Sequence, residues 1–265
     1  NPEPIAVFFD MFYIGEGEVS YRKLLDVYKE SRKNGDSRQE FLRKAAGIPG
    51  IYVPSLYEVT YEEDGTIRSF LPTAPEKVEK QLVMEMTESV YPEKPLVPFI
   101  KATQDRVVLE IMRGCIRGCR FCQAGMIYRP VREKNVEHLK ELAYKMLKST
   151  GHEEISLSSL SSSDYRSLEE LVTFLINTFH GKGVNVSLPS LRIDAFSLDV
   201  MSKVQDVKKS SLTFAPEAGS QRLRNVINKG LTEEDILNGS ALAFQGGWNR
   251  VKLYFMLGLP TETVE

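Results

Sequence analysis

The sequence predicts an α/β protein whose larger part contains a parallel β-sheet. Two observations indicate this class. After residue 105, short runs rich in β-branched and aromatic residues alternate with longer runs whose apolar residues recur at helical spacing. The composition, with 42% hydrophobic residues in a chain of 265, suits a globular fold with a sizeable core. Strand, helix and strand in succession form βαβ units, and repeated units build either a barrel or a doubly wound sheet.

Five strands are expected in this larger part. They cover Arg106–Met112, Glu154–Ser158, Val184–Leu188, Ser211–Phe214 and Arg250–Leu257. The expected helices cover Val136–Leu147, Leu168–Phe179, Ser197–Val204, Gln221–Ile227 and Thr232–Phe244. Ser167 and Glu170 give a capping-box pattern before the second helix, and Thr232 opens the last one. These segments amount to about five βα units.

Residues 1 to about 104 lack this regular alternation and predict a small α/β segment followed by a linker. The expected elements are a strand at Met11–Ile14, helical structure over Tyr21–Ala46 with a break at Lys33–Asp36, and a strand at Ile51–Glu62 that leads into a hairpin turn at Glu63–Thr66. Pro92, Pro95 and Pro98 indicate the extended linker.

Charge and hydropathy exclude two classes of protein. The formal net charge of −2 gives no overall electrostatic footprint for nucleic acid. No run of about 18 apolar residues occurs, so no membrane span is expected. The three cysteines are clustered and odd in number, which is typical of metal ligands in a reducing compartment. We therefore expect a cytoplasmic protein.

The three cysteines, Cys115, Cys119 and Cys122, lie within eight residues at C-x₃-C-x₂-C spacing. Three thiolates at this spacing can bind three irons of a [4Fe–4S] cube and leave the fourth iron open to another ligand. A structural zinc site would need a fourth ligand, and the nearest histidine, His138, lies beyond a basic loop. A redox dithiol of Cys119 and Cys122 would leave Cys115 without a role. The spacing therefore favours the open-iron cluster, with zinc as the alternative.

This spacing resembles the signature of the radical S-adenosylmethionine (SAM) superfamily. The resemblance implies a partial (β/α)₆ TIM-like barrel with the cysteine loop after its first strand, Arg106–Met112. It also implies that SAM chelates the open iron and is cleaved to methionine and a 5′-deoxyadenosyl radical, with a flavodoxin or ferredoxin as electron donor. Only five strands can be counted before Glu265, so the sixth unit is expected outside these residues.

The opening stretch NPEPIAVFFDMFYIGEGEV resembles the end of the cobalamin-binding-like domain that precedes the barrel in one large radical SAM subgroup, related to the methylthiotransferase type. The resemblance implies two domains, with residues 1–104 as the end of a Rossmann domain plus linker and residues 105–265 as the radical SAM core. Histidine is absent before His138, so the first region offers no axial imidazole to cobalt, and cobalamin is a doubtful cofactor.

The same resemblance gives candidate SAM contacts at the ends of the first three strands. Phe121, between the second and third cysteines, stands where the family places an aromatic near adenine; a core aromatic is the other reading. Ser159 and Ser161 stand where many members hold the SAM amino group with a Gly-Gly-Glu-like turn, from which this sequence departs, and a solvated turn is the alternative. Arg192, after the third strand, is a candidate for the SAM carboxylate.

Two further candidates follow the fourth strand, in a stretch that resembles the Glu-x-Gly-Ser-x-Arg motif of several radical SAM subgroups. There, Glu217 is a candidate acceptor for the ribose hydroxyls, and Arg222 is a candidate partner for a carboxylate unless it is simply solvated. Met256–Glu262 resembles the fifth-strand motif beside adenine. All candidates fall at carboxyl ends of predicted strands, where barrels build their sites.

The residues around the cysteines are strongly basic. The stretch from 113 to 134 contains a single acidic residue, Glu133, and six basic residues: Arg113, Arg117, Arg120, Arg129, Arg132 and Lys134. These cations can balance an anionic cluster and SAM, or bind RNA, but no aromatic-interleaved basic stripe accompanies them. The sequence therefore leaves two functions open: a radical SAM enzyme with an unknown substrate, RNA included, or a zinc-stabilised RNA-associated binding module.

Overall fold

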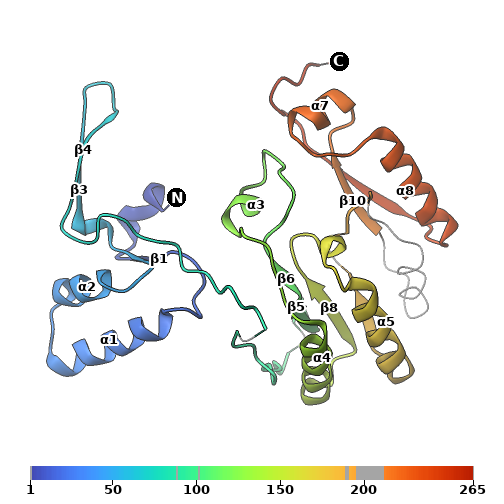
Figure 1. The fold of residues 1–265 in the computed structure, drawn as a ribbon, viewed down its shortest axis with the longest axis horizontal. Helices are drawn as coiled ribbons and strands as arrows, with labels where there is room; N and C mark the ends of the chain where they lie inside the picture. The colour runs from blue at the N-terminus through green and yellow to red at the C-terminus, as the bar shows by residue number, and fades with distance from the viewer. Residues whose placement is uncertain (1, 88, 101, 189–190, 195–211, 265) are drawn as a thin grey trace. The chain divides into compact units, whose positions relative to one another are not determined.

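A computed structural model describes residues 2–87, 89–100, 102–188, 191–194 and 212–264 of the chain (Figure 1). The chain divides into two compact units, Asn1–Met84 and Glu85–Glu265. In the described residues, no helix is long and apolar enough to cross a lipid bilayer.

The first unit holds two helices and two antiparallel strand pairs. Its elements are the 3₁₀ helix η1 (Glu3–Phe8), β1 (Phe12–Tyr13), α1 (Tyr21–Asn34), α2 (Arg38–Ala46), β2 (Ile51–Tyr52), η2 (Pro54–Leu56), β3 (Tyr57–Tyr61) and β4 (Ile67–Pro72). Strand β1 pairs with β2, and β3 and β4 form the expected hairpin. A Rossmann sheet is mainly parallel, so the relation of this unit to a cobalamin-binding-like domain stays a prediction.

The break predicted between the two helices of the first unit is confirmed, and local chemistry explains it. Helix α1 ends at Gly35, whose φ of 75° is left-handed and suits a residue without a side chain. Helix α2 begins with a capping box in which Ser37 accepts from the Glu40 backbone N–H and Glu40 accepts from that of Ser37. Because the stop signal and the start signal lie only two positions apart, the helical run divides into two helices there.

The proline-rich segment after Met84 belongs by its contacts to the second unit. Met86 is 1% exposed, and the Tyr91 hydroxyl donates to the Val108 carbonyl oxygen at 2.8 Å. Glu93 pairs with Lys145 at 2.7 Å. The division after Met84 lies earlier than the boundary near residue 104 that the sequence suggests. The start of the linker, from Met86 to Glu93, contacts a strand and a helix of the core, whereas its apolar residues from Leu96 to Ile100 are exposed.

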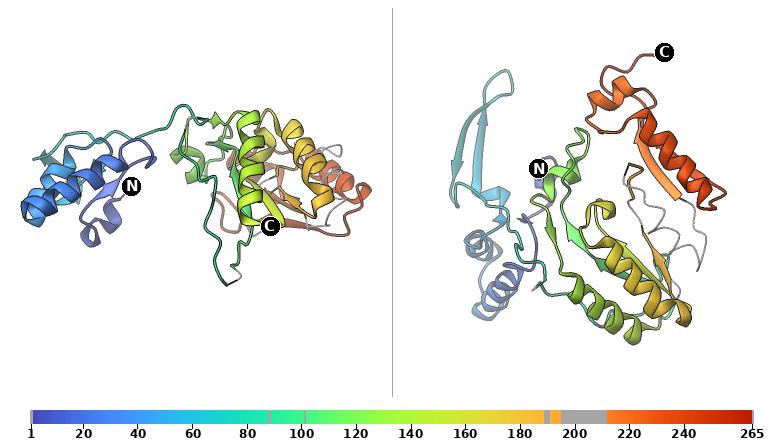
Figure 2. Two further views of the ribbon diagram at one scale, coloured as in Figure 1. Left: turned by 90° about the horizontal axis from the view of Figure 1, so that it is seen from below. Right: turned by 45° about the vertical axis from the view of Figure 1, so that its right-hand side comes forward.

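The first half of the second unit is a three-stranded parallel sheet in the order β5 (Val107–Glu110), β8 (Glu154–Ser158) and β9 (Asn185–Ser187). Helices α4 (Val136–Thr150) and α5 (Leu168–Phe179) pack side by side against it (Figures 1 and 2). Apolar residues of both layers, among them Leu109, Leu142, Leu157 and Leu175, are completely or almost completely buried. This core fixes the strand ends that carry the site.

The second half contains a parallel pair, β10 (Leu212–Glu217) and β11 (Val251–Phe255), with α7 (Gln221–Val226) and α8 (Glu233–Gln245). Phe214 and Trp248 belong to its core. Three short elements surround the cysteine loop: β6 (Met112–Arg113), α3 (Gln123–Ile127) and β7 (Arg132–Glu133). The 3₁₀ helix η3 (Ser162–Asp164) follows β8, and η4 (His180–Lys182) follows α5.

The predicted fold class is confirmed. All five predicted strands are present, they pair in parallel, and helices alternate with them. Within the described residues these strands form two sheets rather than a closed barrel, as expected for a partial TIM-like barrel. The helix expected at Ser197–Val204 lies outside the described residues.

Candidate functional site

The cysteine loop lies beyond the carboxyl end of β5 and is closed at its base by the antiparallel pair of β6 and β7. Gly114 enters this loop with a φ of +85°, and a Cβ atom there would lie 2.7 Å from the carbonyl oxygens of Tyr128 and Pro130. A larger residue would therefore separate the two sides of the loop.

The three cysteines are free thiols with partly exposed side chains. The Arg117 backbone N–H donates to the Cys115 sulfur at 3.4 Å, and that of Gly125 donates to the Cys122 sulfur at 3.3 Å. Such donors stabilise negative charge on sulfur, which suits thiolate ligands of an iron–sulfur cluster. Within the described ranges, no three His, Cys, Asp or Glu side chains converge as ligands of a single metal ion. A [4Fe–4S] cube does not require three side chains close enough to share one ion, because each cysteine binds a different iron of the cube.

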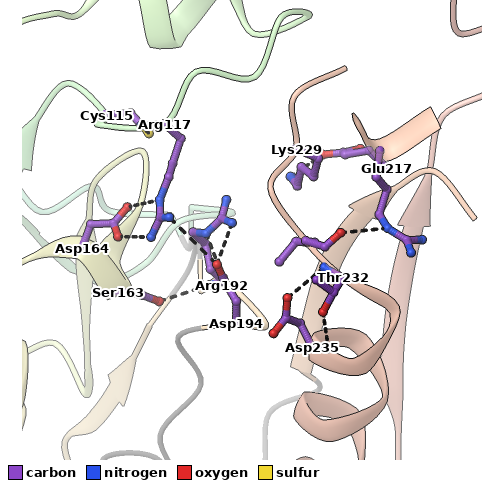
Figure 3. Close-up of polar contacts among 12 residues, drawn as sticks. Cys115, Arg117, Ser163, Asp164, Arg192, Asp194, Glu217, Lys229, Thr232 and Asp235 are labelled. Atoms are coloured by element: carbon purple, nitrogen blue, oxygen red, sulfur yellow. Dashed lines mark hydrogen bonds and ion pairs between the residues drawn. The ribbon is translucent and has the colours of Figure 1, made fainter. Parts of the chain in front are cut away.

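Arg117, between the first two cysteines, anchors the loop to the ends of the next two strands. Its guanidinium donates to both carboxylate oxygens of Asp164, at 3.1 and 2.6 Å (Figure 3). It also lies 4.0 Å from Asp194, which accepts two hydrogen bonds of 2.9 Å from Arg192. Asp164 follows β8, and Asp194 follows β9. A chain of alternating charges therefore links three strand ends.

Asp164 is held in its ionised form by this arrangement. Its side chain is 7% exposed. Burial is the largest single influence and alone would raise the pKa of the carboxyl. The hydrogen bonds from Arg117 and Ser161, together with the charges of Arg117 and Arg192, outweigh burial and hold that pKa below its usual value.

Glu217 ends β10 with a left-handed φ of 68°, a conformation that is strained for a residue with a side chain. Its carboxylate accepts a hydrogen bond from Lys229 at 3.2 Å, and both side chains are mostly buried. The Lys229 ammonium lies 5.9 Å from the ring centroid of Phe121 on the cysteine loop. Thus the end of the fourth predicted strand and the cysteine loop share a cation.

Comparison with known proteins supplies the family. The sequence-family model of the radical SAM superfamily matches residues 109–265. The chain belongs to this superfamily. A second model, of the N-terminal region of radical SAM proteins, matches residues 1–54. The prediction of a radical SAM enzyme, made from the cysteine spacing, is confirmed at the level of the family.

Three curated relatives align with nearly the whole chain. An uncharacterized protein of Methanocaldococcus jannaschii is 34% identical over 99% of the chain and 50% of its own length. A putative methylthiotransferase of the same organism is 23% identical over 96% and 50%, and an uncharacterized methyltransferase of Pyrococcus horikoshii is 24% identical over 95% and 49%. The chain spans about half the length of each.

Two solved radical SAM structures share the fold. The methyltransferase TsrM of Kitasatospora setae, solved with tryptophan and a SAM analog, matches 96% of this chain and 47% of its own at 15% identity, with a TM-score of 0.58. The cobalamin-dependent enzyme OxsB, solved with aqua-cobalamin and SAM, matches 97% and 35% at 16% identity, with a TM-score of 0.62.

The structure brings some candidate SAM contacts of this radical SAM chain together. Phe121, 39% exposed, and Glu217 share Lys229 as a neighbour. Both serine candidates follow β8. Ser159 is partly exposed and shares a hydrogen bond of 3.0 Å with Ser162, whereas Ser161 is 2% exposed and therefore packed inside the protein.

The two arginine candidates already have protein partners. Arg192 binds Asp194, and Arg222 donates to the hydroxyl and the carbonyl oxygen of Thr261 at 3.0 Å each. Arg222 therefore joins α7 to the segment after β11, which connects the two motifs that the sequence places beside SAM. Its role toward a carboxylate stays a prediction.

Sequence reasoning overlooked four contributors: Asp164, Asp194, Arg224 and Lys229. Arg224 is 2% exposed and donates to the carbonyl oxygens of Ala218, Gly219 and Leu231. The motif resemblance draws attention to Arg222, but its neighbour Arg224 is the arginine that holds the turn. For Asp164 a usable signal existed, namely an acid in the serine-rich loop that follows a predicted strand; nothing local marks Lys229.

The basic residues around the cysteines make contacts with other parts of the protein, although Arg120 and Arg129 are exposed. Arg113 pairs with Glu110 at 2.8 Å, Arg117 with Asp164, and the Lys134 ammonium lies 3.7 Å from the Tyr91 ring centroid. Arg120, Arg129 and Arg132 donate to backbone carbonyls. These contacts favour a structural role for the cations over RNA binding.

Proposed function

We propose that Cys115, Cys119 and Cys122 hold a [4Fe–4S] cluster whose fourth iron binds SAM. The observation that carries this proposal is a loop with three free, partly exposed thiols at the carboxyl edge of a parallel sheet, two of which accept backbone N–H bonds. These three thiols, which are sensitive to oxidation, therefore lie at the edge of the sheet where such folds bind their substrates.

When bound, such a cluster supplies the electron that cleaves SAM into methionine and a 5′-deoxyadenosyl radical. The chain's residues orient the cofactor around it. Phe121 would pack against adenine, Glu217 would accept from the ribose hydroxyls, and Ser159 and Ser161 would contact the amino group. Arg192 and Arg222 would bind the carboxylate, and each would exchange one of its present hydrogen bonds for that contact.

The proposed reaction on the substrate is hydrogen-atom abstraction. A substrate C–H bond breaks homolytically, its hydrogen joins the 5′ carbon to give 5′-deoxyadenosine, and the unpaired electron remains on the substrate carbon. The electron consumed comes from a one-electron donor of the flavodoxin or ferredoxin kind.

Metal and sulfide analysis after anaerobic purification tests the proposal. We expect about four Fe and about four sulfides per chain. The single variants Cys115→Ala, Cys119→Ala and Cys122→Ala should lose the brown chromophore and SAM cleavage, because two thiolates do not hold a cube securely. One zinc per chain without sulfide would contradict the proposal and instead support the zinc-stabilised binding module.

A further inference from the structure

The segment from Val226, the last residue of α7, to Lys229 lies against the cysteine loop. The Arg120 backbone N–H donates to the Ile227 carbonyl oxygen at 2.9 Å, and the Arg120 guanidinium donates to the Val226 carbonyl oxygen at 2.5 Å. The Asn228 side-chain amide donates to the Gly118 carbonyl oxygen at 2.8 Å. These contacts hold the residues on both sides of Cys119, across more than 100 positions of sequence.

The segment itself is firmly held. Ile227 is 2% exposed and packs with Ala218, Leu223 and Leu259. The Lys229 backbone N–H donates to the Arg224 carbonyl oxygen at 2.9 Å, and the Lys229 ammonium binds Glu217. Asn228 adopts a left-handed φ of 52°, which asparagine tolerates better than most residues. The segment is therefore a fixed support that does not depend on the cysteine loop.

Gly118 leaves room for the Asn228 amide beside the loop. A Cβ atom at Gly118 would lie 2.9 Å from the Asn228 amide nitrogen, so a larger residue would displace this side-chain end from its present position. The φ of Gly118 is not among the positive values, so the absence of a side chain matters here more than the backbone angles.

We propose that Asn228 is a positioning residue that fixes the loop around Cys119 before any cluster is bound. The inference rests on the proposed function, because the loop is taken to be the cluster loop. It gives the fourth βα unit a second role, since the unit that carries Glu217 also sets where Cys119 stands. The cluster and the SAM contacts thereby share one rigid support.

Asn228→Asp tests this, because the carboxylate keeps the size and the left-handed tendency of asparagine but cannot donate to Gly118. Asn225→Asp is the matched control: it makes the same change on α7, where Asn225 accepts from Gln221 and does not contact the loop. In metal-free protein, trypsin should cleave after the exposed Arg120 about five times faster in Asn228→Asp than in Asn225→Asp, the factor expected for loss of one hydrogen bond.

With the cluster reconstituted, a chelator should remove iron about five times faster from Asn228→Asp, and the SAM concentration that half-converts the electron paramagnetic resonance (EPR) signal should rise. Fluorescence of Trp248, the single tryptophan, monitors global unfolding and should separate a local change from misfolding. Asn228→Gly, which retains the backbone conformation, should behave like Asn228→Asp.

Equal trypsin rates for Asn228→Asp, Asn228→Gly and Asn225→Asp would overturn the inference, whatever the cluster content. A parent protein that builds no cluster, yet shows the predicted difference in trypsin rates, would refute the proposed function and the part of the inference that concerns the cluster, while leaving the loop support intact. Proteolysis and metal analysis thus separate the two failures.

Discussion

Arg117 and Asp164 illustrate how one ion pair can serve the site and the fold together. Asp164 is buried, so removing its charge leaves the Arg117 guanidinium with an incomplete set of acceptors. We expect Asp164→Asn to lower the free energy of unfolding by about 1–3 kcal/mol, measured by urea titration. The exposed Asp26→Asn is a control with no described partner to lose. An equal effect of both variants would contradict a stabilising pair.

The same pair predicts a pH dependence. The folded pKa of Asp164 lies below its unfolded value, so its stabilisation is complete above the unfolded pKa of about 4 and is lost as pH falls through the lower folded pKa. The stability difference between the parent and Asp164→Asn should therefore be constant near neutral pH and shrink below about pH 4. A difference that grows on acidification would have the wrong sign for this account.

Glu217 allows backbone strain and cofactor binding to be separated. At a φ of 68°, Glu217→Gly should be more stable than Glu217→Ala by about 1 kcal/mol, because glycine adopts this region without strain. Both variants lack the carboxylate, so both should weaken SAM binding to a similar extent. Calorimetric binding of SAM and urea titration measure the two effects. Normal SAM binding in both would show that Glu217 does not contact the cofactor.

At the scale of elements, helix caps offer a test that is remote from the cysteines. Thr232 opens α8 with a capping box completed by Asp235. Thr232→Ala should cost about 1 kcal/mol of stability, while Thr232→Ser, which keeps the hydroxyl, should cost less. Iron content should not change in either variant. A Thr232→Ala protein that loses iron at full stability would mean that α8 positions the cluster loop directly.

Elements were predictable where the signal was local. The strand at Glu154–Ser158 was predicted with the bounds that the structure has, and the break near Gly35 follows from adjacent capping residues. Contacts between distant segments were not predictable. Arg117 and Asp164 are 47 positions apart in the sequence. The proline-rich composition of the linker is typical of an exposed segment, so it gives no sign that Tyr91 contacts β5. A single sequence shows which residues alternate, but not which loops meet.

For the whole molecule, the structure predicts where the larger unit begins. A chain that starts at Glu85 keeps the contacts of Met86 and Tyr91, whereas one that starts at Asp105 loses them. We expect the longer version to unfold at a higher urea concentration and the shorter one to aggregate, because it exposes apolar surface of the core. Equal stability of the two would favour the boundary near residue 104.

Strand β11 bears on association of the whole chain. Within the described residues it pairs only with β10, and Tyr254 and Phe255 are about half exposed. Exposed apolar edges pair with other chains. We therefore expect the 265-residue chain to associate, and Tyr254→Lys to reduce association in light scattering. Persistent association in that variant would direct attention to another surface.

The central claim, an open iron that binds SAM, is tested most directly by EPR spectroscopy of the reduced cluster with and without SAM. Chelation changes the coordination of one iron, so SAM should shift the spectrum of the parent protein and of Asn225→Asp. A reduced [4Fe–4S] spectrum that saturating SAM leaves unchanged would contradict the claim, because it would mean that SAM does not reach the iron.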